Sequence, residues 1–392
     1  MKMLADEVRK ELTDHIIPFW KGLRDDEYGG YYGYLSYELK LDKKAVKGCI
    51  LNSRILWFFS NAYMLLKDAS LLSEAEHAYE FMTANCLDRE YGGIFWSLEY
   101  NGAVHDSTKH TYNQAFAIYA LSSFYEASGN EAALRQAKEL QRIIEERCTD
   151  EVGYLEAFKA DFSPESNEKL SENGVMAEKT MNTLLHVLEA YTELYRVSGD
   201  PFTKERLKFI LNIIEKKIYN RELKRQEVFF DRNYNSLIDL HSYGHDIETA
   251  WLVDRTLEVI KDNDMNDRIQ PITIELSRKI YERAYRDHSL LNECEKGVDD
   301  TARIWWVQAE TVVGFANAYE KSGDPKFLKA AEDVWHFIKE YQIDKREGSE
   351  WFYCVLADNT PDSSRPIVEE WKCPYHNGRM CMEIIKREEK GV

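Results

Sequence analysis

The four residues Ser198-Gly199-Asp200-Pro201 return almost unchanged as Ser322-Gly323-Asp324-Pro325, and Ser128-Gly129-Asn130-Glu131 is a third, looser copy. In such a stretch glycine ends one helix, aspartate or asparagine caps the next, and proline fits the first turn of the new helix. Apolar residues follow at helical spacing, for example Leu207, Ile210, Ile213, Ile214 and Ile218. Each stretch therefore predicts a tight turn that joins two long helices into a pair.

A second kind of phrase, rich in aromatic residues and glycine, also recurs along the chain. Tyr28-Gly29-Gly30-Tyr31-Tyr32 returns as Tyr91-Gly92-Gly93-Ile94-Phe95. Weaker copies are Val152-Gly153-Tyr154-Leu155, Glu227-Val228-Phe229-Phe230, Ser289-Leu290-Leu291-Asn292 and Glu350-Trp351-Phe352-Tyr353. Successive copies lie roughly 60–75 residues apart, which indicates repeated supersecondary units. We expect each phrase to form a short β-hairpin loop.

Six helix pairs in a chain of 392 residues predict an all-α fold, an (α/α)6 barrel with short β-hairpins in the loops at one end. An open helical solenoid is the alternative. The closed barrel is favoured because the inner helices would carry bulky aromatic and polar residues together, which suits the lining of a central pocket. No Pro-, Ser- or Gly-rich linker divides the chain, so residues 1–392 are expected to form a single barrel domain.

The composition narrows the choice of partners and compartment. A formal net charge of −18 repels phosphate backbones and anionic lipid heads, so we expect no nucleic-acid partner and no membrane partner. No secretory signal and no apolar run of membrane-spanning length is found. The seven cysteines are odd in number and lack CxxC spacing, which favours free thiols in a reducing cytoplasm. The expected protein is a cytoplasmic monomer that binds a small molecule.

Three histidines stand beside aromatic residues and amides or carboxylates. Asn182 and His186 share a helix face at i, i+4. His376 follows Pro374 and a tyrosine, in a loop expected to run into the last helix. A lone histidine of this kind is about as often a hydrogen-bonded core residue as a functional one. Three of them together favour a functional site.

The third histidine, His245, lies in the stretch His241-Ser242-Tyr243-Gly244-His245-Asp246. At i, i+3, Glu248 can face the same way as His245, and Trp251 follows about one turn later. His241 and His245 also have metal-ligand spacing, but Gly244 weakens a helix that would have to reach back to His241. No HExxH, P-loop or GxGxxG signature is present. We therefore expect neither a metal nor a cofactor, and we expect Asp299 and Asp300 to cap a helix rather than bind a cation.

Other polar and aromatic residues lie in apolar helices. Arg54 needs a partner or a ligand if it faces the inside of the barrel. Tyr112 lies in the stretch from His110 to Phe116, and Trp306 and Glu310 are spaced i, i+4. A pocket that combines such residues suits a carbohydrate, because aromatic rings stack on sugar faces and polar groups bind hydroxyls. Each tryptophan taken alone is equally well explained by core packing.

At these residues the chain resembles the N-acylglucosamine 2-epimerase superfamily, over essentially its whole length. The stretches that carry the resemblance are those around Arg54, His110–Phe116, Asn182 with His186, His245–Trp251, Trp306 with Glu310, and Trp371–Asn377. The ending Trp371-Lys372-Cys373-Pro374-Tyr375-His376-Asn377 resembles the branch that acts on disaccharides, although Cys373 stands where that branch often has glycine. The resemblance implies an (α/α)6 barrel without a metal.

The resemblance also implies an activity, namely reversible epimerisation at C2 of the reducing-end glucose of β-1,4-linked disaccharides such as cellobiose and lactose. The sugar ring would open, and the C2 proton would leave to give a cis-enediolate. On this basis His245 and His376 are the expected acid/base pair, one for transfer of the C2 proton and the other for opening and closing of the ring. Arg54 and His186 would polarise O1 and stabilise the oxyanion. Glu248 and Glu310 are expected to orient histidines and to bind hydroxyls. Tyr112 and Asn182 are expected to position the sugar. Aromatic contact is expected from Trp251, Trp306 and Trp371.

Three alternatives remain open at this point. An aldose–ketose isomerase that acts on mannose would use the same enediolate. An inverting glycosidase on the same fold would need two opposed carboxylates, for which Glu248 and Glu310 are the candidates. A non-catalytic sugar-binding protein would not need three histidines in its pocket.

Overall fold

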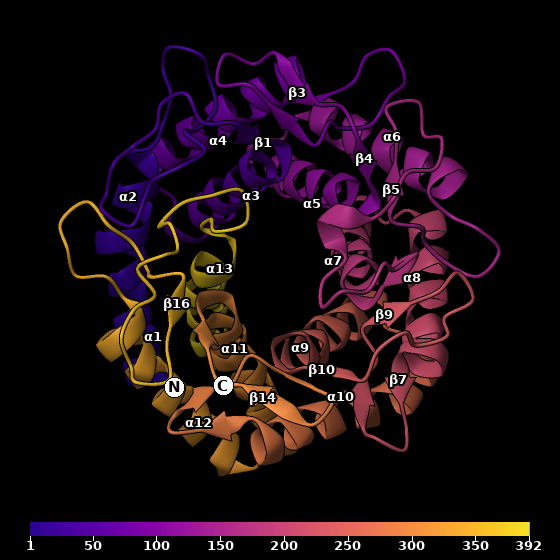
Figure 1. The fold of residues 1–392 in the computed structure, drawn as a ribbon, viewed down its shortest axis with the longest axis vertical. Helices are drawn as coiled ribbons and strands as arrows, with labels where there is room; N and C mark the ends of the chain where they lie inside the picture. Colours follow the sequence, from indigo (N-terminus) through magenta and orange to yellow (C-terminus); the bar gives the residue numbers. More distant parts are fainter. Residues whose placement is uncertain (392) are drawn as a thin grey trace.

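The computed structural model describes residues 1–391 and shows two concentric rings of helices (Figure 1). The inner ring consists of α3 (Cys49–Leu66), α5 (Thr111–Ser128), α7 (Met181–Ser198), α9 (Tyr243–Ile260), α11 (Trp305–Ser322) and α13 (Tyr375–Glu389). The outer ring consists of α1 (Lys2–Glu11) with α2 (Ile17–Lys21), α4 (Ala69–Phe81), α6 (Glu131–Arg147), α8 (Pro201–Ile213), α10 (Asn263–Arg283) and α12 (Pro325–Phe337).

The inner ring closes, so the predicted (α/α)6 barrel is confirmed and the open solenoid is wrong. Each inner helix packs against the next, and α13 packs against both α11 and α3. Five helix pairs are continuous in sequence. The sixth pair joins the two ends of the chain, because α1 packs against α13. The termini therefore lie close together in Figure 1.

The predicted turns between paired helices are present. Gly129, Gly199 and Gly323 end inner helices in the left-handed conformation, which glycine adopts without steric cost. Two further turns use Lys67 and Lys261 in the same conformation, and the sequence analysis missed them because neither is glycine. In every case the side chain of the residue just before the next outer helix caps that helix. These N-cap residues are Asp68, Asn130, Asp200, Asp262 and Asp324.

Several outer helices end in a π-helical turn. These turns are η1 (Leu12–Ile16, between α1 and α2), η2 (Met82–Cys86), η4 (Ile214–Ile218) and η5 (Ile338–Gln342). Each of the last three leads into the hairpin loop that follows its helix. A hairpin loop is present in each of the six repeats, and the six aromatic phrases lie in or beside these loops, as predicted. The fourth hairpin is formed just before its phrase, by β7 (Tyr219–Asn220) and β8 (Arg225–Gln226).

Short antiparallel strands join neighbouring repeats at this end of the barrel. The strand before an inner helix pairs with a strand from the next repeat, as in β1 (Lys47–Gly48) with β2 (Ser97–Leu98). The corresponding pairs are β4 (Lys109–His110) with β5 (Ala157–Phe158), β6 (Lys179–Thr180) with β9 (Phe229–Phe230), β10 (Leu240–Ser242) with β13 (Glu293–Glu295), and β15 (Arg303–Ile304) with β16 (Cys354–Val355). The remaining strands and turn are β3 (Val104–Asp106), β11 (Tyr285–Arg286), β12 (Ser289–Leu290), β14 (Val298–Asp300) and η3 (Glu168–Leu170).

Asp299 and Asp300 lie in β14, so the expectation that they cap a helix is wrong. Asp299 accepts hydrogen bonds from Arg283 and from the hydroxyl of Tyr243. The strand pairing of β13 with β14 uses these residues before the chain reaches the next helix, which begins only at Trp305. Pairing with a neighbouring strand thus decided the conformation of this segment.

Buried lysines fasten the hairpins to the inner helices. Lys47, just before α3, donates to Asp25 at 2.5 Å and to the Gly29 carbonyl at 2.7 Å. Lys109 binds Asp88 in the same way before α5, and Lys179 binds Asp150 before α7. A buried ion pair of this kind fixes the position of the hairpin relative to the helix, because breaking the pair would leave an uncompensated charge inside the protein. It holds the start of each of these inner helices in place.

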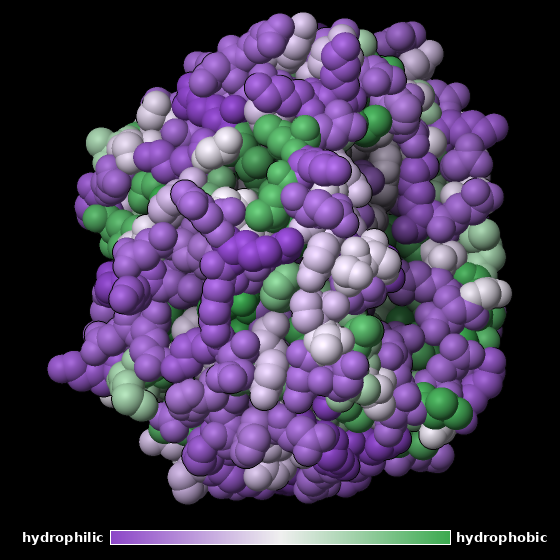
Figure 2. Space-filling model, turned by 60° about the vertical axis from the view of Figure 1, so that its left-hand side comes forward, coloured by the Kyte–Doolittle hydropathy of each residue, from purple (hydrophilic) through white to green (hydrophobic). Residues whose placement is uncertain are grey.

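Among residues 1–391 no helix is both long and apolar enough to cross a bilayer. The face drawn in Figure 2 is mostly hydrophilic, with apolar residues in patches between the polar ones.

Candidate functional site

A cavity of about 330 Å³ opens at the N-terminal ends of the inner helices, and we call it the front cavity. Most of the residues singled out from the sequence lie on its wall. These are Arg54, Tyr112, Asn182, His186, His245, Glu248, Trp306, Trp371 and His376. They meet because each inner helix places its first turns at the same end of the barrel. Six helix N-termini converge here, and their positive dipole ends favour a negatively charged ligand or intermediate.

Each of the three histidines in the front cavity is held through its Nδ1 atom. His186 Nδ1 lies 2.9 Å from Glu189 Oε2, and His376 Nδ1 lies 2.7 Å from Glu310 Oε1. His245 Nδ1 lies 2.7 Å from Ser242 Oγ. Because a carboxylate can only accept, Nδ1 carries the hydrogen in His186 and His376. In the neutral ring the lone pair of Nε2 is then free to accept a proton.

Burial keeps these histidines neutral near pH 7. It lowers the pKa of His245 from 6.5 to about 3, and the neighbouring His186 adds to the effect. Burial, followed by the positive charge of Arg379, lowers the pKa of His376 well below 6.5. The pKa of His186 is lowered by burial, although Glu189 opposes the shift. The neutral imidazole is the form that a general base requires.

Trp306 lies between the two histidines expected to move protons. Its ring centroid is 4.8 Å from that of His245 and 5.6 Å from that of His376. His245 comes from α9 and His376 from α13, and these helices flank α11, which carries Trp306. The two imidazoles therefore approach the cavity from either side of α11.

Arg54 is a buried cation that has no carboxylate partner among residues 1–391. It is 2% exposed, and its guanidinium lies 4.1 Å from the ring centroid of Phe116 and 4.9 Å from that of Tyr375. Its Nη2 donates to the hydroxyl of Tyr112 at 2.8 Å, and its Nε has no partner in the described protein. A desolvated cation of this kind can stabilise an oxyanion strongly.

Three further buried polar atoms of the wall residues have no hydrogen-bond partner among residues 1–391. These are Oδ1 of Asn182, Oε2 of Glu248 and Nε1 of Trp305. Burial, followed by the charge of Glu310, raises the pKa of Glu248 well above 4.5. The Oε2 atom of Glu248 therefore remains available for a hydrogen bond with a ligand hydroxyl.

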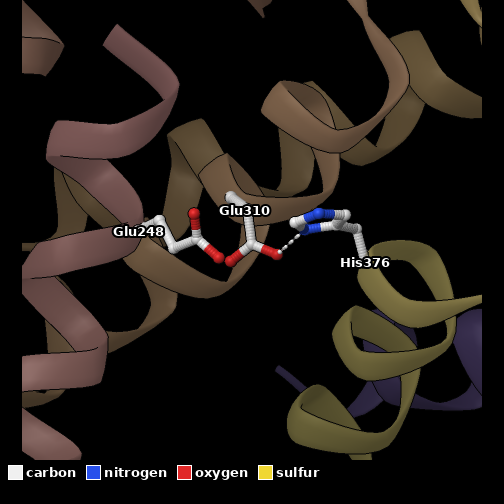
Figure 3. A group of neighbouring side chains, drawn as sticks. All are labelled: Glu248, Glu310 and His376. Atoms are coloured by element: carbon white, nitrogen blue, oxygen red, sulfur yellow. Dashed lines mark hydrogen bonds and ion pairs between the residues drawn. The ribbon is translucent and has the colours of Figure 1, made fainter. Parts of the chain in front are cut away.

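Three of the expected roles change in the light of the geometry. Glu310 orients His376, as expected, and lies between Glu248 and His376 in Figure 3, but it is not one of the residues that line the front cavity. Glu248 orients no histidine, since its Oε1 atom instead accepts from Arg379 at 2.5 Å. Trp251 points away from the front cavity and donates to Glu310 at 2.9 Å. The geometry therefore counts against direct contact between Trp251 and a substrate.

Several residues that support the site were missed. Glu189 stands three residues after His186, and this i, i+3 spacing could have identified it. Ser242 was within the quoted His241–Asp246 stretch but was given no role. Leu170 and Glu172 reach the cavity from the loop 159–178, where Asn173 binds Glu293 and Glu295 of β13. No periodicity marks this loop in the sequence.

Glu248, Glu310 and His376 also offer a possible set of metal ligands. One ligand atom from each lies within 4.8 Å of the others (Figure 3). However, Arg379 Nη2 donates to Glu248 at 2.5 Å and to Glu310 at 2.6 Å. A divalent cation placed between these carboxylates would face the positive guanidinium at close range. The absence of a metal requirement stays a prediction.

Comparison with known proteins gives the family. The family model described as N-acylglucosamine 2-epimerase matches residues 29–376. A cellobiose 2-epimerase of Ruminococcus albus is 54% identical over 385 residues, which cover 98% of this chain and 99% of that relative. The structure of cellobiose 2-epimerase from Bacillus thermoamylovorans B4167 matches with a TM-score of 0.96 at 46% identity, over 99% of this chain and 100% of that one.

A more distant relative bears on the alternative of an aldose–ketose isomerase. A D-mannose isomerase of Marinomonas mediterranea is 21% identical over 387 residues, which cover 92% of each chain. The match to cellobiose 2-epimerases is much stronger and spans nearly the full length of both proteins. The chain belongs to the N-acylglucosamine 2-epimerase family.

Proposed function

We propose that the protein is a carbohydrate epimerase that inverts C2 of the reducing-end glucose of cellobiose and related β-1,4-linked disaccharides. The observation that carries the proposal is the set of three buried histidines, each held by Nδ1 and facing one cavity. The 54% identity to cellobiose 2-epimerases supports the choice of substrate.

The reaction would begin with opening of the sugar ring, which exposes an aldehyde at C1. One of His245 and His376 would then take the C2 proton, and the electron pair would move to O1 to give a cis-enediolate. Arg54 and the six helix N-termini would stabilise the negative charge on O1. The neutral His186 holds its hydrogen on Nδ1 toward Glu189, so this form offers an acceptor at Nε2 and does not donate to O1. The first histidine releases the C2 proton to solvent in the open cavity, and the histidine across α11 takes up a proton from solvent on Nε2. Transfer of that proton to the opposite face of C2 gives the mannose epimer.

The inverting glycosidase fits the geometry less well. Its two carboxylates would have to stand on opposite sides of the scissile bond, about 6.5–9.5 Å apart. Glu248 and Glu310 instead share one nitrogen of Arg379, and Glu310 does not line the cavity. Glu248 and Glu310 are therefore poorly placed to act as such a pair.

The experiment that tests the proposal is the reaction with cellobiose in D2O, followed by NMR. The expected product has a mannose-type reducing end that carries deuterium at C2, because a histidine in an open pocket exchanges its proton with solvent. A ketose labelled at C1 would indicate the isomerase, and free glucose without carbon-bound label would indicate the glycosidase. A mannose-type product without C2 label after many turnovers would rule out solvent-exchanging histidines.

The proposal includes a cytoplasmic monomer. All seven cysteines are buried and unpaired in the described structure, which agrees with a reducing compartment. Light scattering on the purified protein tests the oligomeric state, for which a mass near 46.0 kDa is expected.

A further inference from the structure

Arg379 of α13 lies at the centre of the buried charges beneath the front cavity. It is 1% exposed. Its Nη1 donates to Glu189 and to the hydroxyl of Tyr375, and its Nη2 donates to Glu248 at 2.5 Å and to Glu310 at 2.6 Å. One guanidinium thus binds carboxylates from three different inner helices.

Two of these carboxylates are the ones that hold histidines. Glu189 accepts from His186 Nδ1, and Glu310 accepts from His376 Nδ1. Burial alone raises the pKa of Glu189, but Arg379 and His186 lower it to about 2. Burial likewise raises the pKa of Glu310, and Arg379 opposes that rise. Arg379 therefore favours the ionised carboxylates, which are the forms that accept from both imidazoles.

The guanidinium is also fixed in orientation. Its carbon lies 4.2 Å from the ring centroid of Tyr375 and 4.8 Å from that of Trp251. On its far side Arg379 lines a second cavity of about 600 Å³, at the C-terminal ends of the inner helices, which we call the rear cavity. Small solutes can thus approach the position of Arg379 without passing through the front cavity.

We propose that Arg379 is a positioning residue which, through Glu189 and Glu310, holds His186 and His376 with hydrogen on Nδ1 and a free lone pair on Nε2. Arg379 does not line the front cavity and acts only through these carboxylates. Its catalytic consequence rests on the proposed function, whereas its effect on the histidines does not.

Other groups around the site also bear on its pH dependence. The charged and titratable groups that face Arg379 and His376 are Arg54 from α3, Tyr112 and Tyr119 from α5, His186 and Glu189 from α7, His245 and Glu248 from α9, Glu310 from α11, and Tyr375 from α13. Arg379 is the cation that contributes most to the low pKa of His376 after burial. Its removal should therefore raise the pKa of His376.

The test compares Arg379→Ala and Arg379→Lys with Arg255→Ala as the matched control. Arg255 also lines the rear cavity, but it pairs with Glu193, which holds no histidine. In Arg379→Ala we expect kcat to fall about 10²-fold or more with a smaller change in KM, and the acid limb of the kcat profile to move to higher pH. Arg379→Lys keeps the positive charge, so it should keep the acid limb near its wild-type position.

Chemical rescue and NMR separate positioning from a structural effect. Millimolar guanidinium, which can enter through the rear cavity, should restore part of the kcat of Arg379→Ala, whereas neutral urea should not. In the substrate-free protein, ¹⁵N NMR should show that His186 and His376 lose the Nδ1–H form in Arg379→Ala and keep it in Arg255→Ala.

Each outcome decides the proposal. Unchanged histidine spectra in folded Arg379→Ala would overturn it, whatever happens to activity. If Arg379→Ala does not fold, the same spectra are recorded on Arg379→Gln, which keeps hydrogen-bonding groups but removes the charge, and an Nδ1–H form that is unchanged in both histidines over the whole pH range would overturn it. Altered histidine spectra in an enzyme whose wild type does not epimerise cellobiose would uphold the positioning role and reject the proposed function instead.

Discussion

The front cavity is lined by all six inner helices and the rear cavity by α3, α5, α7, α9 and α13, and the two cavities differ in size and in the state of their polar groups. The rear cavity is the larger, about 600 Å³ against 330 Å³. Its charged residues neutralise one another in ion pairs, such as Arg196 with Glu126 and Lys386 with Glu383. The front cavity holds the three neutral histidines and several polar atoms without partners.

The direction of the helices explains part of this difference. All the N-termini of the inner ring face the front cavity and all the C-termini face the rear cavity, so only the front cavity favours an anionic intermediate. The comparison teaches that size does not identify the reactive end of this barrel. The reactive end is identified by titratable groups that are free to react with a ligand.

The largest expected effect is the loss of a front histidine. His376→Asn and His245→Asn should each lower kcat by about 10² to 10⁴-fold, because asparagine keeps a hydrogen-bonding group but cannot transfer a proton near neutrality. The measurement is the initial rate with cellobiose, together with circular dichroism to verify folding. His336→Asn, an exposed site on α12, is the control. Near-normal activity in either front variant would remove that residue from the mechanism.

A smaller effect is expected from Trp371, which lies on the wall of the front cavity. Trp371→Ala should lower kcat/KM for cellobiose about tenfold, since a stacked aromatic ring contributes on the order of 1 kcal/mol beyond its buried area. Monosaccharides, which lack the second ring, should be affected less. Equal losses for cellobiose and for mannose would show that Trp371 does not serve the second sugar.

The burial of His245 also predicts a dependence of stability on pH. Its pKa is 6.5 when exposed and about 3 in the folded protein. Between these values the unfolded chain binds more protons, so the free energy of unfolding falls as the pH drops below 6.5. The contribution approaches about 1.4 kcal/mol per pH unit for one histidine.

Urea denaturation at a series of pH values measures this contribution. His245→Gln should flatten the slope of unfolding free energy between about pH 4 and pH 6. The control is His288→Gln, because the side chain of His288 is 72% exposed. An identical slope in His245→Gln and the wild type would contradict the deep burial of a neutral His245.

Outside the cluster around Arg379, the rear cavity should tolerate substitution without loss of activity. Met64→Ala changes the rear wall at an uncharged residue. We expect kcat/KM to stay within about twofold of the wild-type value, as for most surface changes away from a site. A loss comparable to that of Trp371→Ala would mean that the two cavities are functionally coupled.

The smallest effect is expected from removal of metals. Prolonged EDTA treatment should leave the rate with cellobiose unchanged, because Arg379 already supplies positive charge to Glu248 and Glu310. Loss of activity that a divalent cation restores would show that the cluster in Figure 3 binds a metal after all.

The sequence by itself determined the helix pairs and their number. Turn chemistry and helical periodicity are local, so Gly199-Asp200-Pro201 indicates the same structure in any context. It also indicated most of the front cavity, because every repeat places the first turn of its inner helix at the same end. His186, His245 and His376 could therefore be expected to meet without any knowledge of distances.

Only the tertiary structure decided how these side chains are held. Arg379 is separated by 190 residues from Glu189 and by 131 from Glu248, and no local pattern relates them. They meet because the two ends of the chain form the sixth helix pair and close the ring. Trp251 was misjudged for the same reason, since helical spacing gives a direction around one helix but not the depth along the barrel. Closure of the ring is a long-range packing event, and it alone determines which buried charges share a partner.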